Sequence, residues 1–264
     1  MGKVITICNN KGGTSKSTTA HTLAVGLHLK GFKVLLIDSD PQCNLSQVSN
    51  INTMENFNTI YELMREDKTI GEVIVKTDNY DIIPGSLSIA RADSEFTQPP
   101  FVANCYYLLK EQLDKVKDAY DFIIIDTPPT LTLITQNCLV ASDSVIIPTQ
   151  ADMFCLNGLA NIKKQIDVIT QRTTNKTLYI EGILITKFSD RTNLNKLLKE
   201  KLFEMANMLK TKVYKFAVRE SVEVREAQTL KTNILLINPN NNSAVDYMNF
   251  IEEFLNDNKK KEVK

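Results

Sequence analysis

The sequence lacks the features that direct a chain into or across a membrane. No stretch of about 18 consecutive apolar residues occurs, so no segment is expected to span a bilayer. The first eight residues also lack the long apolar region and the small-residue cleavage site of a signal peptide. They are typical of a first β-strand, and we expect a cytoplasmic protein.

Glycine and proline are scarce, at 9 and 8 of 264 residues, which argues against a disordered chain. With 43% hydrophobic residues the chain can bury a sizeable core. There is no internal repeat and no linker rich in proline or serine. We therefore expect one domain over residues 1–257, followed by a basic tail at 258–264 that frays.

Cysteines are few and their spacing is not that of a metal or redox site. They are odd in number, scattered, and never arranged as CxxC: Cys8, Cys43, Cys105, Cys138 and Cys155. This pattern predicts reduced, buried thiols rather than disulfides or metal ligands.

The formal net charge is zero, so total charge gives no indication of a polyanionic partner. The distribution is uneven, because residues 187–225 carry more basic than acidic side chains. Such a segment can form a face for nucleic acid, or it can be the solvated surface of a helix. Composition alone leaves both interpretations open.

Apolar, β-branched runs alternate with amphipathic stretches along the chain. The runs lie at 4–8, 34–37, 80–83, 122–125, 144–147, 178–185 and 212–216, and the main helical stretches at 18–30, 101–117, 131–141, 156–170 and 193–209. Strands that are apolar throughout are buried on both faces. The pattern predicts an α/β fold with a doubly wound, mostly parallel sheet and helices on both faces. Ligands bind such folds at the carboxyl ends of the strands.

The first predicted strand runs directly into a glycine-containing loop and then a helix. The loop reads Asn9-Asn10-Lys11-Gly12-Gly13-Thr14-Ser15-Lys16-Ser17-Thr18. Backbone N–H groups at such a helix start make a cradle for phosphate. A lysine at this position reaches the β- and γ-phosphates, and the following hydroxyl binds Mg²⁺. Lys16 and Ser17 occupy these positions, so the loop predicts Mg·ATP binding.

The loop departs from the general pattern GxxxxGK[ST] at two positions, Asn10 and Ser15. The sequence Lys11-Gly12-Gly13 resembles the deviant loop xKGGxGK[ST] of the ParA/MinD family of P-loop ATPases. In that family the extra lysine crosses a dimer interface to the partner's nucleotide, which implies this role for Lys11. Ser15 departs even from the deviant pattern. If its position needs a positive φ, serine costs on the order of 1 kcal/mol and its Cβ crowds the phosphates, which favours slow turnover.

Three further segments resemble the same family. Asp38-Ser39-Asp40-Pro41-Gln42 is similar to its DxDPQ segment, Asp126-Thr127-Pro128-Pro129 to its Walker B sequence, and residues 183–187 to the strand before its base-side loop. The resemblance implies Lys11, Lys16 and Asp40 as catalytic residues and Ser17, Asp38 and Asp126 around the metal. The nucleotide would be held by Lys11, Gly12, Gly13, Thr14, Ser15, Lys16, Ser17, Thr18, Thr186 and Lys187.

The DxDPQ segment is closer to the ParA branch, whose members bind DNA non-specifically as dimers, than to the membrane-cycling MinD branch. The C-terminal helix expected at 244–255 has an apolar stripe and acidic residues on its polar side, which favours packing on the domain over membrane binding. By resemblance, Arg191 is the first DNA-contacting candidate. The wider basic set comprises Arg219, Arg225, Lys196 and Lys199.

The resemblance therefore implies an ATPase for plasmid or chromosome segregation. ATP would drive a sandwich homodimer that binds DNA, and hydrolysis to ADP and phosphate, stimulated by a ParB-like adaptor, would release it. Its location would be cytoplasmic, on the nucleoid when ATP is bound. Two alternatives remain: a MinD-like ATPase that cycles on membranes, and a nucleotide-dependent scaffold that hydrolyses little because of Ser15.

Overall fold

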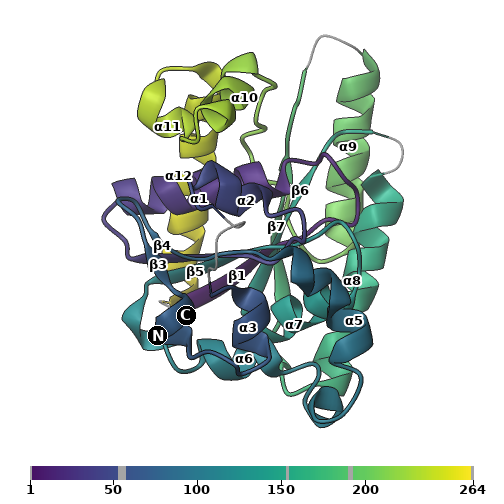
Figure 1. Cartoon of the computed structure of the whole chain (residues 1–264). Helices are drawn as coiled ribbons and strands as arrows, with labels where there is room; N and C mark the ends of the chain where they lie inside the picture. The colour runs from purple at the N-terminus through teal and green to yellow at the C-terminus, as the bar shows by residue number, and fades with distance from the viewer. Residues whose placement is uncertain (1, 53–57, 153–154, 190–192, 263–264) are drawn as a thin grey trace.

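The computed structural model describes residues 2–52, 58–152, 155–189 and 193–262, with the backbone alone at 193–196 and 261–262. Its sheet has the strand order β3-β4-β2-β5-β1-β6-β7 (Figure 1). The strands are β1 (Lys3–Ile7), β2 (Val34–Asp38), β3 (Val75–Lys76), β4 (Asp81–Ile83), β5 (Phe122–Asp126), β6 (Ser144–Thr149) and β7 (Tyr179–Ile185). All neighbouring strands are parallel except β3 and β4, so the mostly parallel sheet predicted from the apolar runs is confirmed.

Helices cover both faces of the sheet (Figure 1). They are α1 (Lys16–Leu29), α2 (Asn44–Val48), α3 (Ile60–Met64), α4 (Ile70–Val73), α5 (Ala92–Glu95), α6 (Leu108–Leu113), α7 (Leu133–Ala141), α8 (Cys155–Arg172), α9 (Asn193–Met208), α10 (Val222–Thr229), α11 (Ile234–Ile237) and α12 (Asn242–Glu262). Three 3₁₀ segments complete the connections: η1 (Leu87–Arg91), η2 (Phe101–Ala103) and η3 (Lys117–Ala119).

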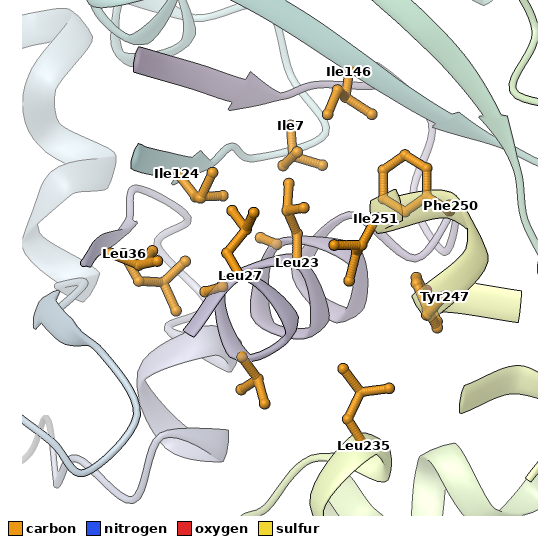
Figure 2. Packing of buried hydrophobic residues seen from close by; sticks show 14 of the residues in the cluster. Ile7, Leu23, Leu27, Leu36, Ile124, Ile146, Leu235, Tyr247, Phe250 and Ile251 are labelled. Atoms are coloured by element: carbon orange, nitrogen blue, oxygen red, sulfur yellow. The ribbon is translucent and has the colours of Figure 1, made fainter. Parts of the chain in front are cut away.

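Side chains alternate between the two faces along each strand. Ile7 of β1 and Ile124 of β5 point to one face, where Leu23 of α1 and Phe250 of α12 cover them (Figure 2). Gly26 allows α12 to lie directly on α1, since a Cβ there would be 2.3 Å from Ile251 Cδ1. The opposite face packs on α3, α6, α7, α8 and α9. Burial on both faces explains why the strands are apolar throughout.

The run at 212–216 was predicted as a strand, and this prediction was wrong. The segment follows the edge of β7, with Ile183 N–H donating to Lys212 O and Tyr214 N–H donating to Ile183 O, both at 2.9 Å. The regular ladder stops there because the amide that donates to Ile185 O is that of Val218, at 2.8 Å, and not that of Phe216. Only an isolated bridge between Ile183 and Val213 results.

The single helix expected at 101–117 is broken into η2, α6 and η3. In a continuous helix the Leu109 amide would donate to the Cys105 carbonyl. Instead Asn137 of α7, which is fully buried, takes both groups: Leu109 N–H donates to its Oδ1 at 3.2 Å and its Nδ2 donates to Cys105 O at 2.6 Å. An inserted side chain of this kind ends a helix.

The C-terminal segment differs from the expected frayed tail. Helix α12 continues to Glu262, so residues 258–262 are helical, and 263–264 lie outside the described residues. Near its end Asn258 Nδ2 donates to Phe254 O at 2.7 Å, and Asn258 Oδ1 accepts from Lys3 Nζ on β1. These contacts hold the end of α12 beside Lys3, the first residue of β1.

Candidate nucleotide-binding site

A cavity of about 750 Å³ lies at the carboxyl ends of the strands. Its wall brings together the glycine-containing loop, Asp40 after β2, the residues after β7 and helix α10. Parallel strands in register align their carboxyl ends, and Asp126 of β5 pairs with both Ile7 of β1 and Asp38 of β2. The fold therefore assembles sequence-distant polar residues at one edge of the sheet.

The loop before α1 contains two residues with positive φ, Gly13 at 75° and Ser15 at 66°. Ser15 is the N-cap of α1 in the left-handed region, its carbonyl accepts from Thr19 N–H at 2.8 Å, and its side chain caps no amide. Ser15 therefore has the positive φ for which backbone strain was predicted. A non-glycine residue in this region costs about 1 kcal/mol. A Cβ added at Gly12 or Gly13 would meet no atom within 4 Å, so these glycines face open space.

Hydrogen bonds to residues at and after the ends of β6 and β7 hold the loop in place. Gln150 Nε2 donates to Gly13 O at 2.9 Å, and Thr186 Oγ1 donates to Thr14 O at 3.2 Å. Asn9 Nδ2 donates to Pro148 O at 2.7 Å. Thr186 was predicted near the nucleotide, whereas no role was predicted for Gln150 or for the side chain of Asn9. The bracing fixes the loop carbonyls, so that the loop amides are available to an anion.

Lys16, at the first position of α1, is buried beside the cavity, with 7% of its surface exposed. Its Nζ donates to Lys11 O at 3.3 Å. Burial lowers the pKa of the ammonium, and the nearby Asp126 carboxylate opposes this effect. Among the described residues this carbonyl is the one hydrogen-bond acceptor of the ammonium, which therefore has donor capacity left for phosphate oxygens.

Asp126 ends β5, interacts with Lys16 of the cavity wall and is fully buried. Neither of its carboxylate oxygens has a hydrogen-bond partner among the described residues. Burial, and then the neighbouring Asp38, raise the pKa of this group well above its usual value, while Ser17 and Lys16 act in the opposite direction. An unpartnered buried carboxylate is costly unless a cation or water satisfies it.

Asp38 is also fully buried but has three hydrogen bonds. Its Oδ2 accepts from Ser46 N–H at 2.8 Å and from Ser46 Oγ at 2.7 Å, and its Oδ1 accepts from Asp40 N–H at 3.2 Å. Burial raises its pKa to about 6 despite these bonds. Asp40 lines the cavity, and its Oδ1 accepts from Gln42 N–H at 2.9 Å, as in an Asx turn.

Within the described part of the chain, no three acidic, histidine or cysteine side chains gather into a ready-made metal cluster. Magnesium does not need one, because it is commonly held by one or two protein groups, water and substrate phosphates. The donors here suit that arrangement: the Ser17 hydroxyl at the cavity wall and the unpartnered carboxylate of Asp126.

Lys11, the extra lysine of the loop, forms an ion pair with Asp152 of its own subunit. Its backbone amide donates to Asn9 Oδ1 at 3.0 Å. The side chain is 40% exposed, so it lies at the surface beside the loop. Lys187 follows β7 with a φ of 50° and lines the cavity wall with Thr186.

The basic residues expected to contact DNA have different surroundings. Arg219 lies against α12, where its Nε and one terminal nitrogen donate to the two oxygens of Asp246, both at 2.8 Å. Arg225 of α10 is exposed at the cavity rim. Lys199 of α9 is half-buried, with Nζ 5.3 Å from the Phe188 ring centroid. Arg191 and the side chain of Lys196 lie outside the described residues.

Helix α12 uses its acidic side chains to pair with the body of the protein. Asp246 pairs with Arg219, Glu252 with Lys30, and Glu253 and Asp257 both with Lys212. Its apolar side, including Tyr247, Phe250, Ile251 and Phe254, is buried. Packing on the domain thus accounts for both sides of this helix. Among the residues that the structure describes, no helix is both long and apolar enough to cross a bilayer.

Comparison with known proteins agrees with this geometry. A family model described as an AAA domain matches residues 2–180. The sporulation initiation inhibitor protein Soj of Bacillus subtilis is 36% identical over 96% of this chain and 98% of its own. The chromosome partitioning protein ParA of Myxococcus xanthus is 33% identical over 94% of this chain and 86% of its own. The chain belongs to the ParA/Soj family of P-loop ATPases.

Solved structures similar to this ParA/Soj family member include nucleotide complexes. A putative plasmid partition protein of Borrelia burgdorferi bound to AMPPNP is 27% identical, with a TM-score of 0.79 over 97% of this chain and 100% of that chain. Cobyrinic acid a,c-diamide synthase of Mycobacterium smegmatis with bound ADP and magnesium is 26% identical, with a TM-score of 0.84 over 98% and 96%. The family resemblance stated from the loop motifs is confirmed.

Proposed function

We propose that this chain is a ParA-type ATPase that segregates plasmid or chromosomal DNA. The observation that carries the proposal is that Lys16 and Asp40 line one cavity and interact with the buried carboxylate of Asp126, which has no hydrogen-bond partner among the described residues. Binding of Mg·ATP satisfies these groups together, because the ligand brings both an anion for Lys16 and a cation for Asp126.

Nucleotide is held by the loop amides from Lys11 to Thr18, with Thr186 and Lys187 on the base side. Ser17 and Asp126 hold magnesium, with Asp38 supporting this shell. The metal supplies neutralisation of phosphate charge. The two solved relatives, one with AMPPNP and one with ADP and magnesium, support the same ligands here.

Hydrolysis requires a positioned water and charge neutralisation. Asp40 orients the water, whose oxygen forms a bond to the γ-phosphorus as the bond to the bridging oxygen breaks, giving ADP and phosphate. Lys16 neutralises the β- and γ-phosphate oxygens. Lys11 of a second subunit reaches the same phosphates across a sandwich dimer, so ATP joins the two subunits and hydrolysis releases them.

The dimer binds DNA non-specifically through the basic side chains of Arg191, Lys196, Lys199 and Arg225. Arg219 contributes less in this proposal, because Asp246 already balances its charge. A ParB-like adaptor stimulates hydrolysis. The protein is cytoplasmic and lies on the nucleoid when ATP is bound. The chromosome-partitioning function named for the Myxococcus xanthus relative supports this assignment.

Size-exclusion chromatography with ATP, ADP or no nucleotide, combined with DNA gel shifts at several salt concentrations, tests the proposal. We expect an ATP-dependent dimer and an ATP-dependent shift that weakens steeply with salt and is indifferent to sequence. Lys16→Ala is the control that loses both effects. Absence of an ATP-dependent shift at low salt in the native protein would remove DNA segregation as the function.

The strained Ser15 favours a second candidate, a nucleotide-dependent scaffold that hydrolyses little. Its Cβ lies in the loop that cradles phosphate, where crowding slows the chemical step more than it weakens binding. A phosphate-release assay separates the candidates. Stable ATP dimers with no phosphate release, with or without DNA, support the scaffold.

A further inference from the structure

The carboxylate of Asp38 closes the segment from residue 40 to residue 46 into a loop. At the start of this segment Asp40 N–H donates to Asp38 Oδ1, and at its end both polar groups of Ser46 donate to Asp38 Oδ2. Inside the loop the Asp40 carbonyl accepts from Cys43 N–H at 2.9 Å, and Cys43 has a φ of 53°. One buried carboxylate thus fixes both ends of the segment that carries Asp40.

Ser46 also connects this loop to the next strand of the sheet. Its Oγ donates to Asp38 and accepts from Gly85 N–H at 2.8 Å, so the fully buried hydroxyl is satisfied as donor and acceptor. Gly85 follows β4, the parallel neighbour of β2, and therefore arrives at the same edge of the sheet. The segment that follows β4 therefore packs against the Asp38 carboxylate through Gly85.

Gly85 allows this close approach because it has no side chain. A Cβ at position 85 would lie 2.9 Å from Asp38 Cγ and 3.0 and 3.2 Å from its two oxygens. Any such atom would displace the carboxylate, because these distances are shorter than van der Waals contact. The glycine is thus required by the neighbouring Asp38.

We propose that Ser46 and Gly85 are positioning residues for hydrolysis: they fix Asp38, and through Asp38 they hold Asp40 at the cavity. This inference rests on the ATPase activity proposed above. Neither residue contacts nucleotide in the proposal, so each affects the chemical step by placing Asp40. Catalysis is sensitive to placement, since a displacement of about 1 Å can cost a hundredfold in rate.

The first test compares Ser46→Ala with Ser46→Thr and with Ser49→Ala. Ser49 is the matched control, since it follows the same short helix and its hydroxyl bonds Leu45 O and Tyr80 instead of Asp38. We expect Ser46→Ala to lower single-turnover phosphate release about tenfold or more, with fluorescent ATP affinity within about twofold of native. Ser46→Thr, which keeps the hydroxyl, restores the rate, and Ser49→Ala does not change it.

Hydrogen exchange gives a readout that does not depend on activity. Without nucleotide, amide exchange in residues 40–48 should rise in Ser46→Ala and remain native in Ser49→Ala. If Ser46→Ala fails to fold, Gly85→Ala provides the second variant, because its Cβ displaces Asp38 while Ser46 remains. Gly85→Ala should show the same loss of rate, with native affinity for fluorescent ATP measured without magnesium, because Asp38 also supports the magnesium shell in the proposed function.

The outcomes separate this inference from the proposed function. If the native protein binds ATP but releases no phosphate while residues 40–48 remain equally protected in Ser46→Ala, the inference is wrong. It is also wrong if the native protein hydrolyses ATP and both Ser46→Ala and Gly85→Ala match its rate. If the native protein does not bind Mg·ATP at all, the proposed function fails first, and the exchange comparison still tests the Ser46–Asp38 contact.

Discussion

Arg219 and Asp246 form a bidentate ion pair that joins the segment between α9 and α10 to helix α12. The Arg219 backbone amide also donates to Asp246 Oδ2 at 3.0 Å, and Ser243 Oγ donates to Arg219 O at 2.7 Å. The Asp246 side chain is only 11% exposed, so this carboxylate depends on its arginine partner. The geometry gives Arg219 a structural role that the basic excess of residues 187–225 did not indicate.

Arg219→Ala is therefore expected to destabilise the fold more than Arg225→Ala. Loss of the paired guanidinium should cost on the order of 1 kcal/mol in the free energy of unfolding, because Asp246 remains mostly buried while the arginine is half-exposed. Urea denaturation of the two variants measures this difference. Equal stability of Arg219→Ala and native protein would contradict a structural ion pair.

DNA binding should respond to the same two variants in the reverse order. Arg225 is exposed at the cavity rim, so Arg225→Ala should weaken binding to all sequences alike and flatten its salt dependence. Asp246→Asn, which removes the competing charge from Arg219, should strengthen low-salt binding. Gel shifts with ATP at several salt concentrations provide the measurement. A larger loss in Arg219→Ala than in Arg225→Ala would restore Arg219 as the main DNA contact.

Substitution of Ser15 tests the strain in the phosphate loop. Ser15→Gly removes the Cβ from a left-handed position, although the flexible glycine offsets part of the gain. We expect its free energy of unfolding to exceed that of Ser15→Ala by about 0.5–1 kcal/mol, since alanine keeps the Cβ. We also expect faster phosphate release in Ser15→Gly alone. Identical behaviour of the two variants would mean that the loop accommodates a Cβ at this position.

His21 provides a test of pH-dependent stability. It is 4% exposed on α1, its ring is nearly perpendicular to that of Tyr80, and burial lowers its pKa to about 4. The folded protein therefore resists protonation of His21, whereas the unfolded chain takes up the proton near pH 6.5. The stability contributed by neutral His21 is present above pH 6.5 and is lost as the pH falls toward 4.

By pH 4 the decrease in the free energy of unfolding that is due to His21 should approach about 3 kcal/mol. Urea denaturation between pH 7 and 4 should show a shallower decline in His21→Gln than in the native protein. The other histidine, His28, lies exposed on the same helix, and His28→Gln should decline as steeply as the native protein. Parallel curves for all three proteins would contradict the assignment to His21.

Local sequence patterns predicted the parts of the site that are contiguous in the chain. A buried strand followed by Lys16 and Ser17, and apolar strands ending in Asp38 and Asp126, specify both an element and its polar end. Contacts between distant segments left no such signal. Gly85 is important only because Asp38 lies beside it, and the break at Leu109 depends on Asn137, 28 positions later.

The ion pair between Lys11 and Asp152 leads to a prediction about subunit association. Lys11 is proposed to reach the partner's nucleotide, so Asp152 competes with that phosphate for the same ammonium. Asp152→Asn removes the competing charge and should lower the ATP concentration that gives half-maximal dimer by about two- to fivefold, because a partly exposed ion pair contributes up to about 1 kcal/mol. Lys11→Ala should give no ATP dimer while still binding fluorescent ATP as a monomer. Light scattering coupled to size exclusion, at a series of ATP concentrations, measures both variants. If Asp152→Asn needs as much ATP as the native protein to dimerise, the ion pair within one subunit does not oppose dimerisation. If Lys11→Ala dimerises normally, the proposed role of Lys11 across the interface is wrong.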